Sequence, residues 1–337
     1  MNSHLKFIHS GFTLLEMVLV LFLIGLMASA TLMLTEGVED QAKYDETKRR
    51  ITMMRHAIVG DTSRTVNGAP EISGFVADMG RLPLCLAELL TAGDSSGVNI
   101  FESPCDAAVT INSWDVDLTT GIGTGWRGPY IYVLPERNSL LAFRDGYGNS
   151  AITDEEDNKN FGWEYDLSGA QLDISSIAFD VVNPADNINA NIVVSSDWEV
   201  RLPSTVEVTF KNQNLASLPI ADEKLVLVIY LDGDSTYVEG NDSSNDFLSL
   251  DASSAIPSYT SKTIQFTLDS VPEITIGTRT YGIVCYNPVA TVEASEYVIF
   301  DGDCNSSENP GQDKSTLRTF SVLPRQNINL NLDWIIE

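Results

Sequence analysis

The chain has 337 residues, and its 47 acidic and 20 basic side chains give a formal net charge of −27. This excess of carboxylates argues against direct binding to nucleic acid or to anionic lipid headgroups, because both rely on Lys and Arg. The length allows two globular domains, and an apolar share of 43% is enough to build their cores, which excludes a disordered acidic tail.

The N-terminus is a short polar leader followed by an apolar run. Residues 1–11 hold one basic side chain, Lys6, and the 19 residues from Met17 to Thr35 carry no charge. As a helix this run is about 28 Å long, close to the thickness of a bilayer core. Because Lys6 precedes the run, the positive-inside rule keeps the leader in the cytoplasm and sends the body outward. We therefore predict a transmembrane helix over 17–35.

One carboxylate, Glu16, lies at the start of this segment. A lone charge that must enter lipid is expensive and is by default a candidate functional group. Its natural partner is a positive charge at the same depth, and cleavage after Gly11 would create one, the α-amino group of Phe12. The alternative is a charge at the helix start that reaches back to the headgroups.

The six residues from Gly11 to Glu16 read Gly-Phe-Thr-Leu-Leu-Glu and precede an apolar helix. This pattern resembles the prepilin signal of type IV pilins and type II secretion pseudopilins. The resemblance implies cleavage after Gly11 by a prepilin peptidase, N-methylation of Phe12, and pairing of Glu16 with the Phe12 amine of a neighbouring subunit. It implies other pilin or pseudopilin subunits and an inner-membrane assembly platform as partners. It places the chain as a single-pass protein of the inner (cytoplasmic) membrane, then in a periplasmic or extracellular filament.

The helix is predicted to continue past the membrane to about residue 60. Residues 36–55 have mixed charge with opposite charges spaced i, i+4, and an intermittent apolar stripe of Val38, Ile51, Met54 and Ile58. Gly60 is a plausible end. Many pilins have a proline midway in the apolar segment, whereas this chain has only Gly25 there.

Residues 61–200 are predicted to form a pilin-like head with short strands and a short helix near residues 85–90. The run Gly125 to Ile131 reads Gly-Trp-Arg-Gly-Pro-Tyr-Ile, and Asp145 to Asn149 reads Asp-Gly-Tyr-Gly-Asn, a tight turn whose two glycines would accept positive φ. This series resembles the head of the major pseudopilin, although Ser150 stands where that family usually has proline. Strands are expected at 162–165 and 172–177.

The same resemblance implies a calcium site in the segment after the turn. Hard oxygen donors follow one another there, and we name Asp145, Asn149, Asp154 and Asp157 as candidate Ca²⁺ ligands. The alternative is a solvated acidic hairpin in which the Asn and Asp side chains only make turns.

From residue 201 to 337 the sequence predicts an all-β domain. Runs of alternating or continuous apolar residues recur at short intervals, which favours an antiparallel sandwich. The intervening loops at 232–246 and 301–303 are acidic but lack EF-hand spacing. The predicted strands are 205–210, 224–231, 263–268, 281–286, 296–300 and 328–332.

Four cysteines fall into two local pairs, 20 and 19 residues apart, with no CxxC motif. In an exported chain the simplest pairing is Cys85 with Cys105 and Cys285 with Cys304, although four cysteines allow three pairings. Buried thiols are the alternative.

The three histidines, His4, His9 and His56, provide neither a multi-His zinc site nor an obvious catalytic base once the leader is removed. We therefore expect a non-catalytic protein of α+β class: leader 1–11, helix 12–60, head 61–200 and β-sandwich 201–337. The expected function is that of a filament subunit, a minor pilin or pseudopilin whose C-terminal domain presents a binding or adhesive surface. The alternative is a membrane-tethered binding protein that does not polymerise.

Overall fold

The structure is a computed structural model of the full chain. The predicted leader, with Gly11 and Phe12, lies outside the residues it describes. Side chains of 30–36 in the first helix are also not described. The described residues are 13–61, 63–66, 69–117, 121–136, 140–179, 187–218, 223–231, 237–241, 248–250, 255–268, 273–285, 298–300, 302, 317–324 and 330–337.

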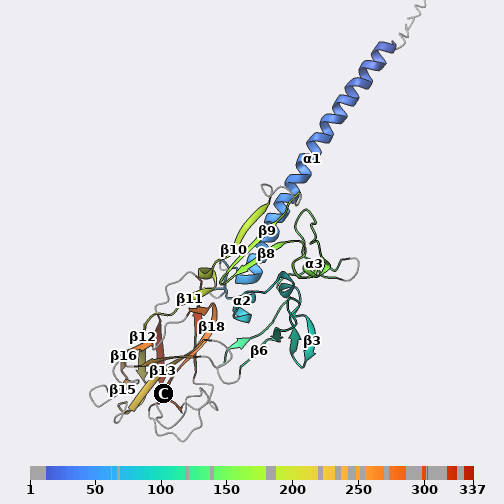
Figure 1. The fold of residues 1–337 in the computed structure, drawn as a ribbon. Coiled ribbons are helices and arrows are strands. Elements are labelled where there is room, and N and C mark those ends of the chain that lie inside the picture. The colour runs from blue at the N-terminus through green and yellow to red at the C-terminus, as the bar shows by residue number, and fades with distance from the viewer. Residues whose placement is uncertain are drawn as a thin grey trace, which may run out of the picture.

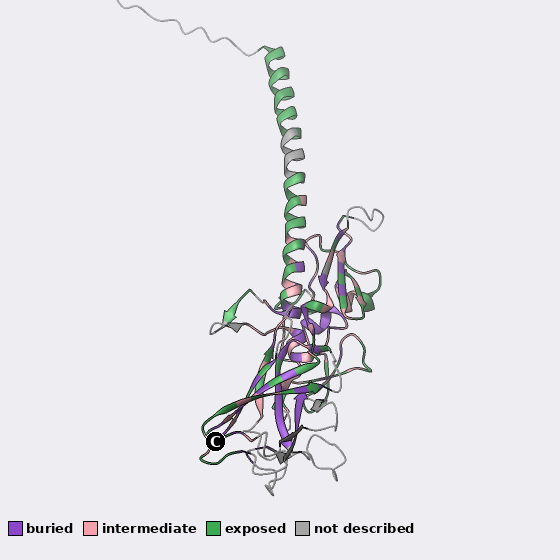
Figure 2. Cartoon of the chain, turned by 90° about the vertical axis from the view of Figure 1, so that its left-hand side faces the viewer, coloured by how far each residue is buried: buried purple, intermediate pink, exposed green. Residues whose placement is uncertain are grey.

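The chain begins as one long helix, α1 (Leu14–Val59), of 46 residues. Its described side chains before residue 30 are all exposed, while Ile51, Met54 and Ile58 are buried in the head (Figure 2). These three residues form the buried part of the stripe expected from the sequence, whereas Val38 is exposed. The helix ends at Gly60, whose φ of 78° suits a residue without a Cβ.

Within the described part of the chain, no helix is both long enough and apolar enough to cross a membrane. The uncharged run of 17–35 continues past Ser29, beyond which the side chains are not described.

The head packs a three-stranded antiparallel sheet, in the order β10-β9-β8, against the lower half of α1 and two short helices. The predicted strands at 162–165 and 172–177 correspond to β8 and β9, and the predicted short helix is the 3-10 helix η1. The elements are α2 (Phe75–Met79), η1 (Leu86–Leu89), α3 (Asp154–Asn160), β8 (Glu164–Ser168), β9 (Gln171–Ser176), β10 (Ile188–Val193) and the 3-10 turn η2 (Ser195–Asp197).

The head also contains three smaller antiparallel sheets among its described residues. They are β1 (Thr65–Val66) with β2 (Ala69–Pro70), β3 (Asp94–Gly97) with β4 (Ile100–Glu102) and β5 (Thr110–Asn112), and β6 (Asp115–Val116) with β7 (Gly123–Thr124).

The alternative of an acidic hairpin after the turn is wrong for residues 154–160, because the structure forms helix α3 there. Thr153 caps the helix by accepting a hydrogen bond from the Glu156 amide at 3.3 Å, and four acidic residues fill its first turn. Negative charge at a helix N-terminus is favourable, so the acidic run stabilises a helix start. Thr153 and Glu156 have the spacing of a capping box, a signal present in the sequence.

The C-terminal domain is built on one nine-stranded sheet that folds over a main core. Its path runs β19-β18-β13-β14-β16-β12-β21, with β15 paired to β13 and β20 to β18. Alternate side chains of β12, such as Val206, Val208 and Phe210, point into this core. The strands are β12 (Thr205–Asn212), β13 (Glu223–Tyr230), β14 (Tyr237–Asn241), β15 (Leu248–Leu250), β16 (Ser261–Leu268), β18 (Gly277–Cys285), β19 (Val298–Ile299), β20 (Arg318–Val322) and β21 (Asn331–Ile336).

Three sequence predictions for this domain need correction. The expectation of antiparallel pairing throughout is wrong for β21, which runs parallel to β12. The last strand also begins later than predicted, because Leu332, Trp334 and Ile336 supply its inward face. The acidic loop at 232–246 contains β14, and its remaining residues lie outside the described part of the chain.

The head and the β domain meet through a strand pair at the boundary expected near residue 200. There β11 (Glu199–Arg201) pairs with β17 (Glu273–Thr275). The exposed half of α1 projects from one end of the molecule and the β domain lies at the other (Figure 1).

Candidate functional site

The described chain starts with a capped helix end that contains Glu16. The Glu16 carboxylate accepts hydrogen bonds from the Thr13 amide at 2.8 Å and from the Thr13 hydroxyl at 3.0 Å. The Thr13 hydroxyl in turn accepts from the Glu16 amide at 3.3 Å, which completes a capping box. Within one chain, Thr13 therefore holds the Glu16 carboxylate at the first turn of α1.

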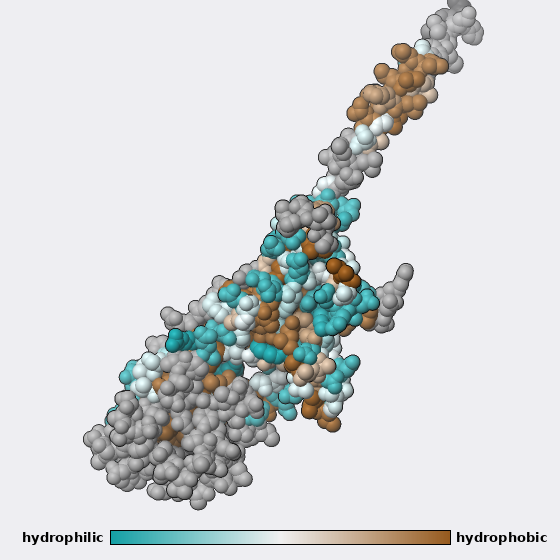
Figure 3. Space-filling model, viewed as in Figure 1, coloured by the Kyte–Doolittle hydropathy of each residue, from teal (hydrophilic) through white to brown (hydrophobic). Residues whose placement is uncertain are grey.

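Beyond this cap, α1 presents large apolar side chains that are exposed to solvent. Leu14, Phe22 and Met27 are 83%, 66% and 71% exposed. Figure 3 shows the matching hydrophobic surface over the projecting end of the helix. Scattered exposed apolar residues are common, but a continuous run of this kind marks a surface that another apolar phase or partner covers.

The lower half of α1 is fixed to the head by polar contacts. Arg55 donates to the carbonyl oxygen of Ile192 and to the buried Asp197 carboxylate, the latter at 2.9 Å. Arg50 donates to the Arg144 carbonyl oxygen at 2.5 Å. The helix therefore packs against the head from about residue 43 to its C-terminal end. The described residues that precede this part project away from the head.

The turn at Asp145–Asn149 docks on α1, and its two glycines serve different purposes. The Gly146 amide donates to the Thr47 hydroxyl at 2.9 Å, and a Cβ on Gly146 would lie 2.1 Å from the Lys43 carbonyl oxygen. Gly148 has a φ of 75°. The prediction that both glycines adopt positive φ is therefore wrong for Gly146, which is needed for close approach of the backbone to the helix.

The structure brings two of the four candidate calcium ligands together. The Asp145 carboxylate is buried and accepts from the amides of Tyr147 and Asn149 at 3.1 and 3.0 Å. It also accepts from the Asn149 side-chain amide at 2.7 Å and from the Ser176 hydroxyl at 2.5 Å. These four donors use the hydrogen-bonding capacity of the carboxylate, which ties the turn to β9.

The other two candidate ligands, Asp154 and Asp157, lie on α3, where Asp157 forms an ion pair with Arg144. Asp157 accepts both guanidinium donors of Arg144, at 2.8 and 2.7 Å, and the Ala151 amide at 2.8 Å. Asp154 is an exposed residue of the first turn of α3. Among the described residues, no group of three or more His, Cys, Asp or Glu side chains is arranged to hold a metal ion. In this structure Asp145 and Asn149 hold the turn, and Asp157 forms an ion pair with Arg144, while the calcium site stays a prediction.

We expect Asp157→Asn to lower the free energy of unfolding by about 1–3 kcal/mol at neutral pH, because the change removes a charge-assisted pair in a partly buried site. Hydrogen bonding from Arg144 holds the pKa of the Asp157 carboxyl below its ordinary value. A lowered folded-state pKa stabilises the fold above the ordinary carboxyl pKa of about 3.9 and loses that contribution as the pH falls through the lowered value.

Urea unfolding of both chains between about pH 7 and pH 3 measures this effect. The difference between wild type and Asp157→Asn should be constant near neutral pH and shrink in acid. Asp154→Asn is the matched control, since the sequence gives both residues the same role. Stabilisation of the wild-type chain by added calcium, lost to an equal degree in both variants, would instead support the calcium site.

A disulfide joins Cys85 to Cys105, as predicted, with their Cα atoms 5.7 Å apart. It ties the start of η1 to the loop after β4. Of the second predicted pair, Cys285 ends β18 with its side chain not described, and Cys304 lies outside the described residues.

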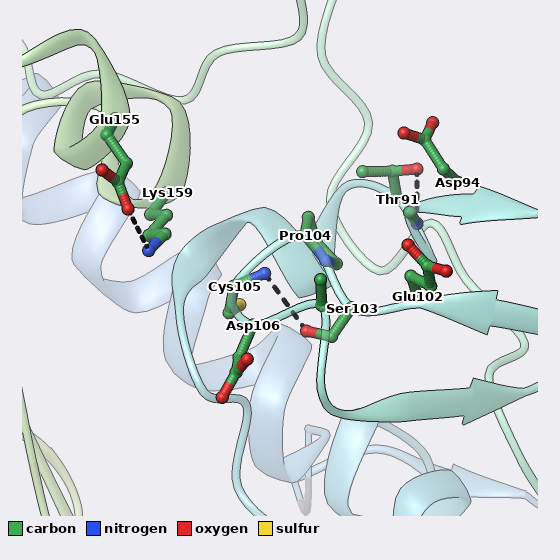
Figure 4. Close-up of a pocket in the computed structure, with 11 residues that line it drawn as sticks. Thr91, Asp94, Glu102, Ser103, Pro104, Cys105, Asp106, Glu155 and Lys159 are labelled. Carbon is green, nitrogen blue, oxygen red and sulfur yellow. Dashed lines mark hydrogen bonds and ion pairs between the residues drawn. The ribbon is translucent and has the colours of Figure 1, made fainter.

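An open pocket of about 720 Å³ lies beside this disulfide (Figure 4). Its rim is acidic, with Lys159 paired to Glu155 at 3.1 Å. The remaining charged residues of the lining are Asp94, Glu102 and Asp106. His56 is exposed on α1, far along the chain from the pocket lining.

Sequence reasoning missed two residues that organise these regions. Thr13 was part of the prepilin-like motif, but its capping role follows from the Thr-x-x-Glu spacing with Glu16. Arg144 precedes the turn and joins Glu136, Asp157 and the Asn149 carbonyl oxygen. No local pattern indicates these partners, because Arg144 reaches groups up to 13 residues away.

No protein-family model matches the chain, and no curated protein and no solved structure matches it either.

Proposed function

We propose that this chain is a non-catalytic subunit of a type IV pilus or type II secretion pseudopilus. It is held in the inner membrane through 17–35 before assembly and is built into the filament through α1. The observation that carries the proposal is the apolar, exposed N-terminal part of α1, with the carboxylate Glu16 at its start.

The physical argument rests on the cost of that exposure. Burial of one large aliphatic or aromatic side chain contributes about 1.5–3 kcal/mol, and α1 exposes a dozen of them between Leu14 and Met27. Lipid around a single subunit, and then packed helices of neighbouring subunits, would each cover this surface. The 46 residues of α1 extend about 69 Å, enough for one half to be buried in this way while the other half belongs to the head.

In this proposal Glu16 selects the partner that the N-terminal part of α1 packs against in the filament. A carboxylate in the low dielectric of a helix bundle is stable only with a partner, and the Phe12 amine of a processed neighbour would supply a positive charge. Thr13 satisfies the carboxylate within one chain, so the free subunit would carry it at lower cost.

The combined size of the head and the β domain supports a subunit that is present in few copies per filament. A major subunit must repeat closely along a helical lattice, and the β domain of residues 201–337 adds to the head at the end opposite α1 (Figure 1). We therefore propose a minor pilin or tip-type pseudopilin that presents its β domain to a partner.

Shearing and fractionation test this function. The chain should appear in sheared filaments at low copy number relative to the major subunit. A chain that is confined to the membrane fraction in a strain with normal filaments would instead be a tethered binding protein.

A further inference from the structure

The β domain contacts the head at a second place, away from the β11–β17 strand pair. Ile122, in the connection before β7, is 2% exposed and packs with residues of the β domain. The other members of this cluster are Val226, Val228 and Tyr230 of β13 and Val284 of β18, all buried, with the partly buried Leu317 packed against it. A head side chain thus completes a small apolar core on the outer surface of the β-domain sheet.

This contact explains the composition of β13. Leu225, Leu227 and Ile229 face the main core of the β domain, while Val226, Val228 and Tyr230 lie on the opposite face. An antiparallel strand with one solvated face alternates apolar and polar residues, whereas a continuous apolar run requires cover on both faces. The cover on the second face includes the β6–β7 hairpin.

The hairpin is firmly attached to the head. The Gly125 amide donates to the Asp78 carbonyl oxygen of α2 at 2.8 Å, and the Trp126 indole donates to the Glu88 carbonyl oxygen of η1 at 2.9 Å. The Trp114 ring lies against Gly123 so closely that a Cβ there would be 2.5 Å from it. In Figure 1, β6 lies on the side of the head nearest β18.

The contact at the β11–β17 strand pair also includes apolar packing between the two domains. The Ile276 amide, just after β17, donates to the Trp198 carbonyl oxygen at 2.8 Å. Ile276 itself is buried in the head core together with Trp198. The head therefore places Ile122 in the small apolar core on the β domain, and the β domain places Ile276 in the head core.

We propose that the β6–β7 hairpin is a strap that locks the β domain to the head, so that the two move as one rigid body. A single strand pair would act as a hinge, and domains joined in one chain move relative to each other by default. Two apolar contacts at separate places remove that freedom. The strap would fix the direction in which the β domain points relative to α1.

Distances between two spin labels test the strap in the full, detergent-solubilised chain. The labels are carried on ketone-bearing amino acids, so that the cysteines stay untouched, at Ile152 of the head and Leu215 of the β domain, which are 93% and 85% exposed. Wild type should give one narrow distance distribution. Ile122→Asp should lose it, because a carboxylate cannot remain against Val226 and Val228 without a partner.

Val116→Asp, on the other strand of the same hairpin and 40% exposed, is the matched control and should keep the narrow distribution. Ile122→Ala leaves a cavity without a charge and should broaden the distance distribution to an intermediate degree. This variant keeps the test valid if circular dichroism shows that the Asp variant is misfolded. A broad wild-type distribution, or an unchanged width in the folded Ile122 variants, overturns the strap. Neither result bears on whether the chain assembles into filaments.

Discussion

Glu16→Ala is expected to give a chain that is processed and inserted in the membrane but is lost from sheared filaments, with at least about a tenfold fall in the incorporated amount. The proposed assembly contact pairs the Glu16 carboxylate with the Phe12 amine of a neighbour in a nearly water-free helix bundle. Loss of the carboxylate leaves that amine buried and unpaired, which is costly. Immunoblots of sheared and membrane fractions from the same cells measure the effect.

Three further variants separate charge from helix capping. Glu16→Gln keeps a hydrogen-bonding side chain next to Thr13 but removes the charge, and should fail to assemble. Thr13→Ala removes the hydroxyl of the cap but keeps the charge, and should reduce assembly less. Glu39→Ala, further along α1 and 67% exposed, removes a carboxylate paired with Lys43 and should assemble as wild type does. Normal incorporation of Glu16→Ala would refute the assembly role of this residue.

Glu88→Gln should produce the largest loss of stability of any head variant considered, about 3–5 kcal/mol. The Glu88 side chain is fully buried, and its carboxylate accepts two donors of Arg81 at 2.8 and 3.0 Å. It also accepts from the Leu84 amide at 2.9 Å and the Ser103 hydroxyl at 2.7 Å. An amide in its place would turn a donor toward other donors and leave the Arg81 guanidinium without its counter-ion.

Urea unfolding of the detergent-solubilised chain, followed by tryptophan fluorescence, measures this loss. Trp126 donates to the Glu88 carbonyl oxygen and so reports on the region. Glu155→Gln is the matched control, because it breaks an ion pair with Lys159 on the surface, where Glu155 is 81% exposed. Such pairs contribute little, so this variant should unfold like wild type. Equal stability of the two variants would show that the Glu88 network is not a stabilising element.

The sequence predicted the features that depend on local pattern. The extent of α1, the strands β8, β9, β12 and β13, and the Cys85–Cys105 bond all follow from periodicity or spacing. Helix α3 also has a local signal, the Thr153 cap, but its acidic run was interpreted as a loop of calcium ligands or a solvated hairpin rather than as a favourable first turn. The prediction failed there because composition was weighed above capping.

The features that the sequence did not predict depend on contacts between distant segments. Gly146 appears suited to a positive φ, yet its role is set by α1, about 100 residues away. Glu88 gives no sign of full burial, since its partner Arg81 and the Ser103 hydroxyl converge only in the fold. The ion pair of Asp157 is of the same kind, because Arg144 reaches it from outside the acidic run.

Mass analysis of the N-terminus of the chain recovered from sheared filaments tests the central claim most directly. The claim is that α1 is the assembly element of a processed filament subunit. The account predicts a filament-borne chain that begins at Phe12 with a methylated amine and lacks residues 1–11. A filament-borne chain that retains Met1, or a chain found only in the membrane, would contradict it.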